Sequence, residues 1–272
     1  MIESKSRART LINVIGMPSL LAIIYYGGIV FTTFMFFVIF LCTYELRNIT
    51  KIKGYALNIS FLYIIYFFMY LTNLVEFIVI NINVIIVLIC LLLLISEIYN
   101  KNKFSLENIS VTMLAFIWIG YFLNKAVYLR SLDDGFQIIL SIFLSVWACD
   151  SAAFIVGTKF GNKKIAPSIS PNKTWEGTIA GYVFSSFFIY FLVYNNFLQI
   201  NNYIFTTIDI IIMGIIIGII GQLGDFFESM IKREFNVKDS GTLLQGHGGV
   251  LDRFDSLLFV IPAFYIFIKL TI

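Results

Sequence analysis

Residues 206–229 read TTIDIIIMGIIIGIIGQLGDFFES and decide the fold class. The stretch is apolar almost throughout up to Ile220 and becomes polar within the next few residues. An apolar run of about 20 residues matches the roughly 30 Å hydrocarbon core of a bilayer. The sequence therefore predicts a membrane-spanning helix over 206–224 that ends in a polar segment.

Runs of this kind recur along the whole chain. Its 272 residues are 59% hydrophobic and only 13% charged, whereas about a quarter of the residues in a soluble domain are charged. We therefore expect an all-α fold, a polytopic integral membrane helical bundle. About nine transmembrane helices are predicted, at 11–27, 29–45, 55–72, 75–96, 109–124, 136–157, 176–197, 206–224 and 256–271.

The domain prediction is a single membrane domain over 1–272. Within it, the N-terminal helices of 1–140 are expected to act as a scaffold with dimer or lipid contacts, and 141–272 is expected to be the catalytic half. No internal repeat of the kind found in inverted-repeat transporters is evident. The apolar start of the chain lacks a convincing A-x-A cleavage site, so an uncleaved first helix is favoured over a signal peptide.

The basic residues predict the topology. Short cytoplasmic loops of membrane proteins carry an excess of Lys and Arg. With the N-terminus in the cytoplasm, only Lys125, Arg130 and Lys269 of the 19 basic residues fall on the outer side. We therefore expect a multi-pass protein of the cell membrane whose polar segments 158–175 and 225–255 face the cytoplasm.

Two classes of partner are excluded by composition. The net charge is only +3 and is spread over many loops, without the basic stripe typical of nucleic-acid binding. Cys42, Cys90 and Cys149 lie in apolar segments without CxxC spacing. They are expected to be buried small hydrophobes rather than parts of a disulfide or a metal site.

Asp150 comes late in an apolar run. A charged residue at the centre of a membrane helix costs about 2.5–3.5 kcal/mol on insertion scales. Such a residue either hydrogen-bonds to a neighbouring helix or belongs to a site that faces a polar cavity. A transporter or channel would also explain it.

A second set of polar residues follows the apolar part of 206–229. Asp225, Glu228, Ser229 and Lys232 share one face if the helix continues. Two acidic groups on that face suit Mg²⁺, which usually takes one or two carboxylates together with phosphate oxygens and water. A charged helix end that emerges into water has a similar pattern.

The next segment is rich in glycine, and it runs from Gly246 and His247 through Gly248 and Gly249 to the acidic pair Asp252 and Asp255. Glycines let backbone amides approach an anionic ligand closely. Asp255 is expected either to cap the last helix or to act in catalysis, and His247 either to orient substrate or to shape the loop.

The segment 157–177 contains Lys159, Lys163, Lys164 and Lys173 among Gly, Ser and Thr residues. Lysines beside a membrane helix are often a topology signal or an attraction to anionic lipid. Here the neighbouring Ser, Thr and Gly residues favour a site for phosphates.

These motifs together resemble the phosphatidate cytidylyltransferase (CDP-diacylglycerol synthase) family. The resemblance rests on Ser229-x-x-Lys232-Arg233-x4-Lys238-Asp239-x-Gly241, continued by Gly246-His247-Gly248-Gly249-x-x-Asp252-Arg253-x-Asp255-Ser256. Gly224-Asp225-x-x-Glu228, Asp150-Ser151 and 170–177 (SPNKTWEG) resemble other motifs of the same family. The likeness spans about 110 residues. Gln245 is one departure, because many relatives have proline there, and it bears on loop rigidity.

The resemblance implies transfer of a cytidylyl group from CTP to phosphatidate, giving CDP-diacylglycerol and diphosphate in phospholipid biosynthesis. It also implies Mg²⁺, with room for a second cation, and a homodimer. The expected metal ligands are Asp225 and Asp252, with Asp150 and Glu228 as further candidates. The expected catalytic residues are Asp150, Lys232, Arg233, Lys238, Asp239, His247, Arg253 and Asp255. The expected substrate-binding residues are Ser170, Lys173, Thr174, Glu228, Ser229, Gly246, Gly248 and Gly249.

Two other functions stay open on the sequence. A CTP-dependent polyprenol kinase would use the same nucleotide on a lipid alcohol, although the long signature argues against it. A membrane transporter would use Asp150, but it would not explain two polar segments of phosphate-binding composition.

Overall fold

The computed structural model describes residues 2–74, 82–100, 105–200, 203–243 and 248–271. The first four long helices are α1 (Ile2–Tyr26), α2 (Gly28–Thr50), α3 (Ile59–Leu74) and α4 (Ile82–Asn100). Short helix η1 (Lys51–Lys53) follows α2. The start predicted for the fourth helix, at 75, lies outside the described residues. Apart from the charged start of α1, these helices are mainly apolar, as expected of helices that cross a membrane.

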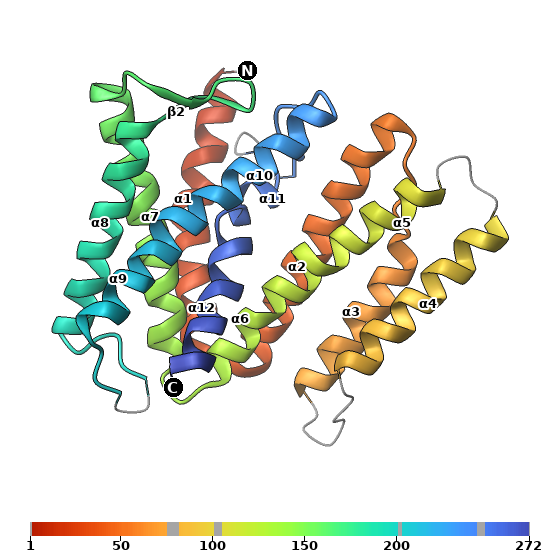
Figure 1. Ribbon diagram of the computed structural model, residues 1–272, viewed down its shortest axis with the longest axis horizontal. Helices are drawn as coiled ribbons and strands as arrows, with labels where there is room; N and C mark the ends of the chain where they lie inside the picture. Colours follow the sequence, from red (N-terminus) through yellow and green to blue (C-terminus); the bar gives the residue numbers. More distant parts are fainter. Residues whose placement is uncertain (1, 75–81, 101–104, 201–202, 244–247, 272) are drawn as a thin grey trace.

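The rest of the chain continues the helix bundle, in which α5 lies beside α4 and α7 lies beside α8 (Figure 1). Its elements are α5 (Ser105–Leu114), η2 (Ala115–Tyr121), α6 (Phe122–Ser131), α7 (Gly135–Phe160), β1 (Lys164–Ala166), β2 (Ser170–Thr174), α8 (Trp175–Tyr194), α9 (Thr207–Ile215), η3 (Ile216–Ile220), α10 (Gly221–Glu234), α11 (Leu251–Phe254) and α12 (Leu257–Thr271).

The helices confirm the all-α membrane bundle. Among the described residues, six helical stretches are long and apolar enough to cross a membrane: Gly28–Lys53, Leu106–Ser131, Gly135–Phe160, Trp175–Tyr194, Thr207–Glu234 and Leu251–Thr271. Val14–Tyr26 and Ile59–Leu74 are shorter apolar helices. The chain is therefore a multi-pass membrane protein, for which the predicted count of nine is approximate.

Two of the long helices contain a π-helical segment. The segments η2 and η3 continue α5 into α6 and α9 into α10 without a break. A π segment adds one residue to a turn, and such insertions occur frequently at functional sites. The segment η3 directly precedes α10, which carries Asp225 and Lys232.

The prediction that 158–175 and 225–255 are loops is wrong in part. The helix predicted to end at 224 continues through α10 to Glu234, so the first ten residues of the expected 225–255 loop are helical. The polar residues there are compatible with a helix because they pair with one another along one face. The 158–175 segment also contains a small antiparallel hairpin, β1 with β2, in which Lys164 lies opposite Thr174 and Ala166 opposite Ser170.

Helices α7 and α8 pack closely along a row of small residues. A Cβ atom on Gly177 would lie 2.7 Å from the Ala153 carbonyl oxygen, and one on Gly181 would lie 3.0 Å from the Cys149 sulfur. Small residues at such interfaces allow the backbones of membrane helices to approach each other. This row fixes α7, which carries Asp150, beside the start of α8.

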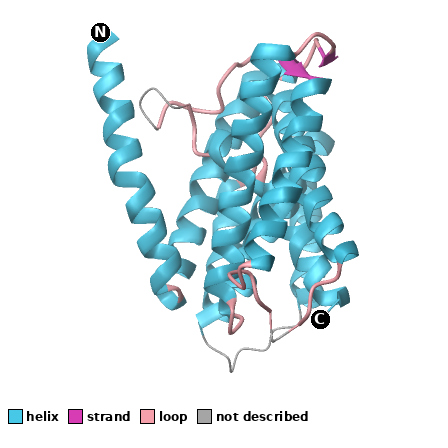
Figure 2. Cartoon of the chain, turned by 90° about the vertical axis from the view of Figure 1, so that its left-hand side faces the viewer, coloured by secondary structure: helices cyan, strands magenta, loops and turns pink. Residues whose placement is uncertain are grey.

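The helices alternate in direction, so the connections collect at two ends. The N-terminus and the hairpin lie at one end and the C-terminus at the other (Figures 1 and 2). Arg130 donates to the carbonyls of Ile24 and Tyr25 at the C-terminal end of α1. Lys269 stacks on Tyr128. The residues predicted for the outer side therefore gather at the end away from the hairpin.

Candidate active site

Helix α10 supplies one face of the candidate site. Ser229 Oγ donates to Asp225 Oδ1 over 3.3 Å, and Lys232 Nζ lies 2.6 Å from Glu228 Oε2 one turn further on. Both are contacts between residues four apart, which lie on the same side of an α-helix. The prediction that Asp225, Glu228, Ser229 and Lys232 share a face is confirmed.

The first charged group, which we call the Lys173 group, joins α10 to the hairpin and α7. Lys173 Nζ lies 2.5 Å from Asp225 Oδ2 and 4.5 Å from the centre of the Phe226 ring. Asp150 and Asp255 interact electrostatically with both Lys173 and Asp225. This group therefore contains one lysine and three carboxylates, and its formal charges leave an excess of negative charge.

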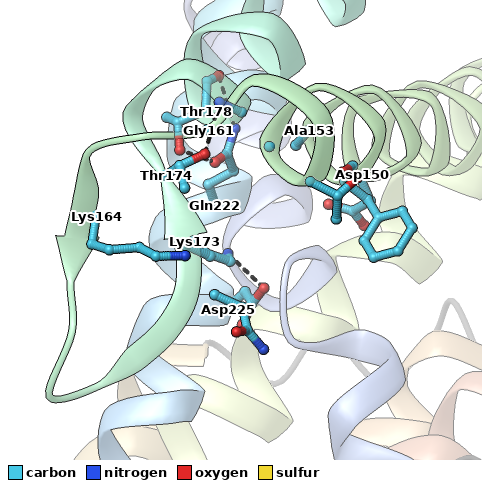
Figure 3. Close-up of a pocket in the computed structure, with 14 residues that line it drawn as sticks. Asp150, Ala153, Gly161, Lys164, Lys173, Thr174, Thr178, Gln222 and Asp225 are labelled. Carbon is cyan, nitrogen blue, oxygen red and sulfur yellow. Dashed lines mark hydrogen bonds and ion pairs between the residues drawn. The ribbon is translucent and has the colours of Figure 1, made fainter.

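A cavity of about 620 Å³ opens beside this group (Figure 3). Asp150 on α7 and Asp225 on α10 line it, and Lys164 and Lys173 extend into it from the hairpin. The other lining residues are Ala153, Phe154, Gly157, Thr158, Gly161, Asn172, Thr174, Gly177, Thr178 and Gln222. The structure thus brings the Lys-, Thr- and Gly-rich segment 157–177 to the same cavity as the two acidic residues.

Thr174 holds the rim of the cavity in shape. Its hydroxyl accepts a hydrogen bond from the Gly177 amide and so caps the N-terminus of α8. Thr178, one turn on, donates to Gln222 Oε1 over 2.7 Å, and Gln222 Nε2 donates to the Gly218 carbonyl. The sequence did not single out Gln222 or Thr178, because neither carries a charge.

The second charged group, which we call the Lys232 group, is more deeply buried. Lys232 Nζ lies 2.7 Å from Asp252 Oδ1 in addition to its contact with Glu228. The Glu228 side chain is only 1% exposed, and among the described residues Glu228 Oε1 has no hydrogen-bond partner. The lysine therefore bridges two carboxylates that come from α10 and α11.

The backbone completes the binding of Asp252. Its Oδ2 accepts hydrogen bonds from the amides of Gly249 and Ser240, at 2.7 and 3.0 Å. Gly248 has φ +81°, and a Cβ atom there would lie 2.6 Å from Asp252 Oδ2. The Gly249 amide therefore binds a carboxylate of the protein itself in this structure.

Glu45 of α2 lies in the same region, and the sequence did not indicate it. Its side chain accepts hydrogen bonds from Ser240 Oγ, the Val250 amide and the Leu251 amide, each over 2.9 Å. Glu45 is 1% exposed. In the sequence, Glu45 looks like an ordinary charged residue at the membrane boundary. Only its contacts with residues far along the chain identify it, and a single sequence does not show such contacts.

Other predicted residues are placed at the margin of these groups. Arg233 donates to the carbonyls of Ile169 and Val237, which ties the hairpin to α10. Lys238 and Asp239 are exposed. Ser170 begins β2, Arg253 lies in α11, and Asp255 Oδ1 accepts from the Ser256 amide just before α12. Gly246 and His247 lie outside the described residues.

The donor groups fit Mg²⁺ bound together with a phosphate ligand. No three His, Cys, Asp or Glu side chains in the described part of the chain are arranged to hold a metal ion by themselves. Asp150 and Asp225 nevertheless line the same cavity, within a group whose formal charge is negative. Mg²⁺ typically combines one or two carboxylates with phosphate oxygens and water, which this arrangement permits.

The fold and these groups define a membrane-embedded protein with a cavity lined by lysines and carboxylates at one end of its helix bundle. The chain belongs to the cytidylyltransferase family, whose model matches residues 7–271. A phosphatidate cytidylyltransferase of Staphylococcus haemolyticus is 35% identical over 257 residues, which cover 94% of this chain and 96% of that protein.

Two further relatives carry the same name. The phosphatidate cytidylyltransferase of Bacillus subtilis is 39% identical over 181 residues, 66% of this chain and 65% of that protein. The one of Staphylococcus epidermidis is 34% identical over 259 residues, 94% of this chain and 96% of that protein. The family suggested by the motifs is therefore confirmed.

Proposed function

We propose that the chain is a phosphatidate cytidylyltransferase, which converts CTP and phosphatidate to CDP-diacylglycerol and diphosphate. The observation that carries the proposal is the cavity at the end of the bundle. It combines lysines of the hairpin with Asp150 and Asp225, next to helices that lie in the membrane. Two relatives that align over 96% of their length are named phosphatidate cytidylyltransferase, and they support the choice of substrates.

The reaction joins two anions. A phosphate oxygen of phosphatidate attacks the α-phosphorus of CTP, a new P–O bond forms there, and the bond between the α-phosphorus and the bridging oxygen breaks. Diphosphate leaves with the electron pair of that bond. Positioning and charge neutralisation supply most of the catalysis in such transfers.

The residues of the cavity suit these tasks. Lys164 and Lys173 line the cavity and supply positive charge for the phosphates of CTP. The α8 N-terminus follows directly after Thr174, and helix N-termini favour phosphate groups. Lys232 holds the α11 segment close to α10, so its role is to keep Asp252 in position.

Asp225 and Asp252 are the proposed ligands of Mg²⁺ and of a second cation where one is used, with Asp150 and Glu228 as further candidates. A bound divalent ion would neutralise the charge that develops on the leaving diphosphate. Asp225 faces the cavity, whereas Asp252 is bound by Lys232 and two amides. The two proposed ligands thus have different surroundings.

The position of a radioactive label tests the reaction. With purified protein in detergent micelles, label from α-labelled CTP should enter a phosphatidate-derived lipid, and label from γ-labelled CTP should appear in diphosphate. EDTA should abolish both. Polyprenol offered separately should give no product. A lipid labelled from γ-labelled CTP would mean phosphoryl transfer by a kinase instead.

The proposed orientation places the N-terminus and the active site on the cytoplasmic side of the cell membrane. It is supported by the charge bias between the two sets of loops. Single cysteines at Leu243 and at Asp133, both exposed and close to opposite ends, test it in a variant that lacks the native cysteines. An impermeant thiol reagent should label only position 133 from outside intact cells, and labelling of position 243 would reverse the topology.

The homodimer is proposed from the family resemblance alone. Light scattering of the purified protein, with the detergent contribution subtracted, should give twice the chain mass of 31.1 kDa. A mass of one chain at micromolar concentration would contradict it.

A further inference from the structure

The buried carboxylate of Glu45 comes from the half of the chain that was expected to act as a scaffold. It lies in the last turns of α2, and its three hydrogen-bond donors belong to residues about 200 positions later in the sequence. A carboxylate that is 1% exposed would be costly without such partners. The three donors satisfy it, so the contact is a specific link from α2 to Ser240, Val250 and Leu251.

The same short segments bind Asp252. Ser240 gives its amide to Asp252 and its hydroxyl to Glu45. Gly249 gives its amide to Asp252, and the next residue, Val250, gives its amide to Glu45. The carboxylates of Glu45 and Asp252 therefore share donors from the same two places in the chain, Ser240 and the pair Gly249 and Val250.

The packing leaves little freedom for these segments to move. A Cβ atom on Gly241 would lie 2.6 Å from Glu45 Oε1, and one on Gly249 would collide with both Glu45 and Ser240. Displacement of Glu45 would therefore shift the donors that hold Asp252. A shift of about 1 Å in a positioning group can lower a rate about 100-fold.

We propose that Glu45 is a positioning residue for cytidylyl transfer, which fixes Asp252 through Ser240 and the 249–251 backbone. The inference rests on the proposed function. Glu45 does not line the cavity with Asp150 and Asp225, so it acts through Asp252 and not on the substrate. The N-terminal half thereby contributes to catalysis as well as to the framework of the bundle.

Glu45→Gln tests this proposal because glutamine keeps the size but replaces one acceptor oxygen by an NH₂ donor, which would face the amide of Val250 or Leu251. We expect kcat to fall about 100-fold, while KM for CTP changes less than about threefold because the cavity is untouched. Glu45→Asp keeps the charge and should recover part of kcat. Glu97→Gln is the matched control, since Glu97 is also buried in the N-terminal half and contacts Asn108 instead.

Hydrogen–deuterium exchange gives a readout that does not depend on activity. The amides of Ser240 and 249–251 should exchange faster in Glu45→Gln, while those of α7 should not change. Ser240→Ala removes one donor to Glu45 but keeps the hydrogen bond from the backbone amide of residue 240 to Asp252, so it should lower kcat by a smaller factor. It also serves as the test if Glu45→Gln does not fold.

Four results would overturn the proposal. The first two are a wild-type kcat in folded Glu45→Gln and unchanged exchange at 249–251. The third applies where Glu45→Gln does not fold, and it is a wild-type kcat in Ser240→Ala. The fourth is a loss of activity in Glu45→Gln no greater than its loss of folded protein, the result expected for Glu97→Gln, which would make Glu45 merely structural. If the wild-type protein forms no CDP-lipid, the proposed function fails, and the exchange measurement still decides whether Glu45 holds the segment.

Discussion

The Lys173 group and the Lys232 group contain the same residue types but differ in exposure and support. Lys173 and Asp225 are 23% and 29% exposed and border the cavity. Lys232, Glu228 and Asp252 are 12%, 1% and 11% exposed, and two backbone amides bind Asp252. The open group can exchange its partners for a ligand, whereas the closed group holds α10, α11 and the backbone at Ser240 and Gly249 together.

Asp225→Asn should have the largest effect on activity. It removes a carboxylate from the open group, so Mg²⁺ would lose a ligand and CTP would lose the ion that binds its phosphates, while the bundle keeps its packing. We expect kcat/KM to fall about 1,000-fold, with little change in the midpoint of thermal denaturation. Asp133→Asn is the control, since Asp133 is an exposed carboxylate near the other end. Normal turnover by Asp225→Asn would remove this residue from the site.

Asp252→Asn should lower both activity and stability, which distinguishes the closed group from the open one. The change replaces a carboxylate that faces Lys232 and two N–H donors. Leaving buried donors poorly satisfied costs about 1–3 kcal/mol each. Thermal denaturation in detergent, measured beside turnover, checks this. If Asp252→Asn is inactive but as stable as wild type, the backbone support is not important for folding.

Lys173→Ala and Lys232→Ala compare the two lysines directly. Lys173→Ala should raise KM for CTP about tenfold, which is about 1.4 kcal/mol, and should leave stability nearly unchanged. Lys232→Ala should destabilise the protein, because it leaves two buried carboxylates without their counter-charge. Equal effects of the two variants on KM and on the denaturation midpoint would erase the distinction between the groups.

Lys53→Ala should have the smallest effect. Lys53 pairs with Glu234 at the end of α10, but their side chains are 35% and 65% exposed. Exposed ion pairs contribute about 0–1 kcal/mol. Turnover and the denaturation midpoint should both stay close to the wild-type values, and a large loss of either would show that the end of α10 must be fixed for function.

The sequence predicted the parts of this fold that depend on local patterns. Apolar segments of bilayer length gave the helices, and the spacing of Asp225, Glu228 and Lys232 gave their shared face. The bias of basic residues also predicted that the polar segments 158–175 and 225–255 face the same side, and the cavity joins Lys173 of the first segment to Asp225 of the second.

What the sequence could not predict depends on contacts between distant residues. Glu45 is linked to Val250 across 205 positions, and no local pattern indicates such a pair. The hairpin β1/β2 is short and lies where lysines suggested only a loop. The π segment η3 consists of apolar residues that would also suit a regular α-helix. The proposed roles of Lys238, Asp239 and His247 stay predictions.

The row of small residues between α7 and α8 has a consequence for protein engineering. Replacing glycine by alanine within a helix usually raises helix stability by up to about 1 kcal/mol. At Gly177 the added methyl would press on the Ala153 carbonyl, and at Gly181 on Cys149 and Gln222. Such changes would force apart the two helices that border the cavity. A thermostabilised variant should therefore keep both glycines, even though they are poor helix formers.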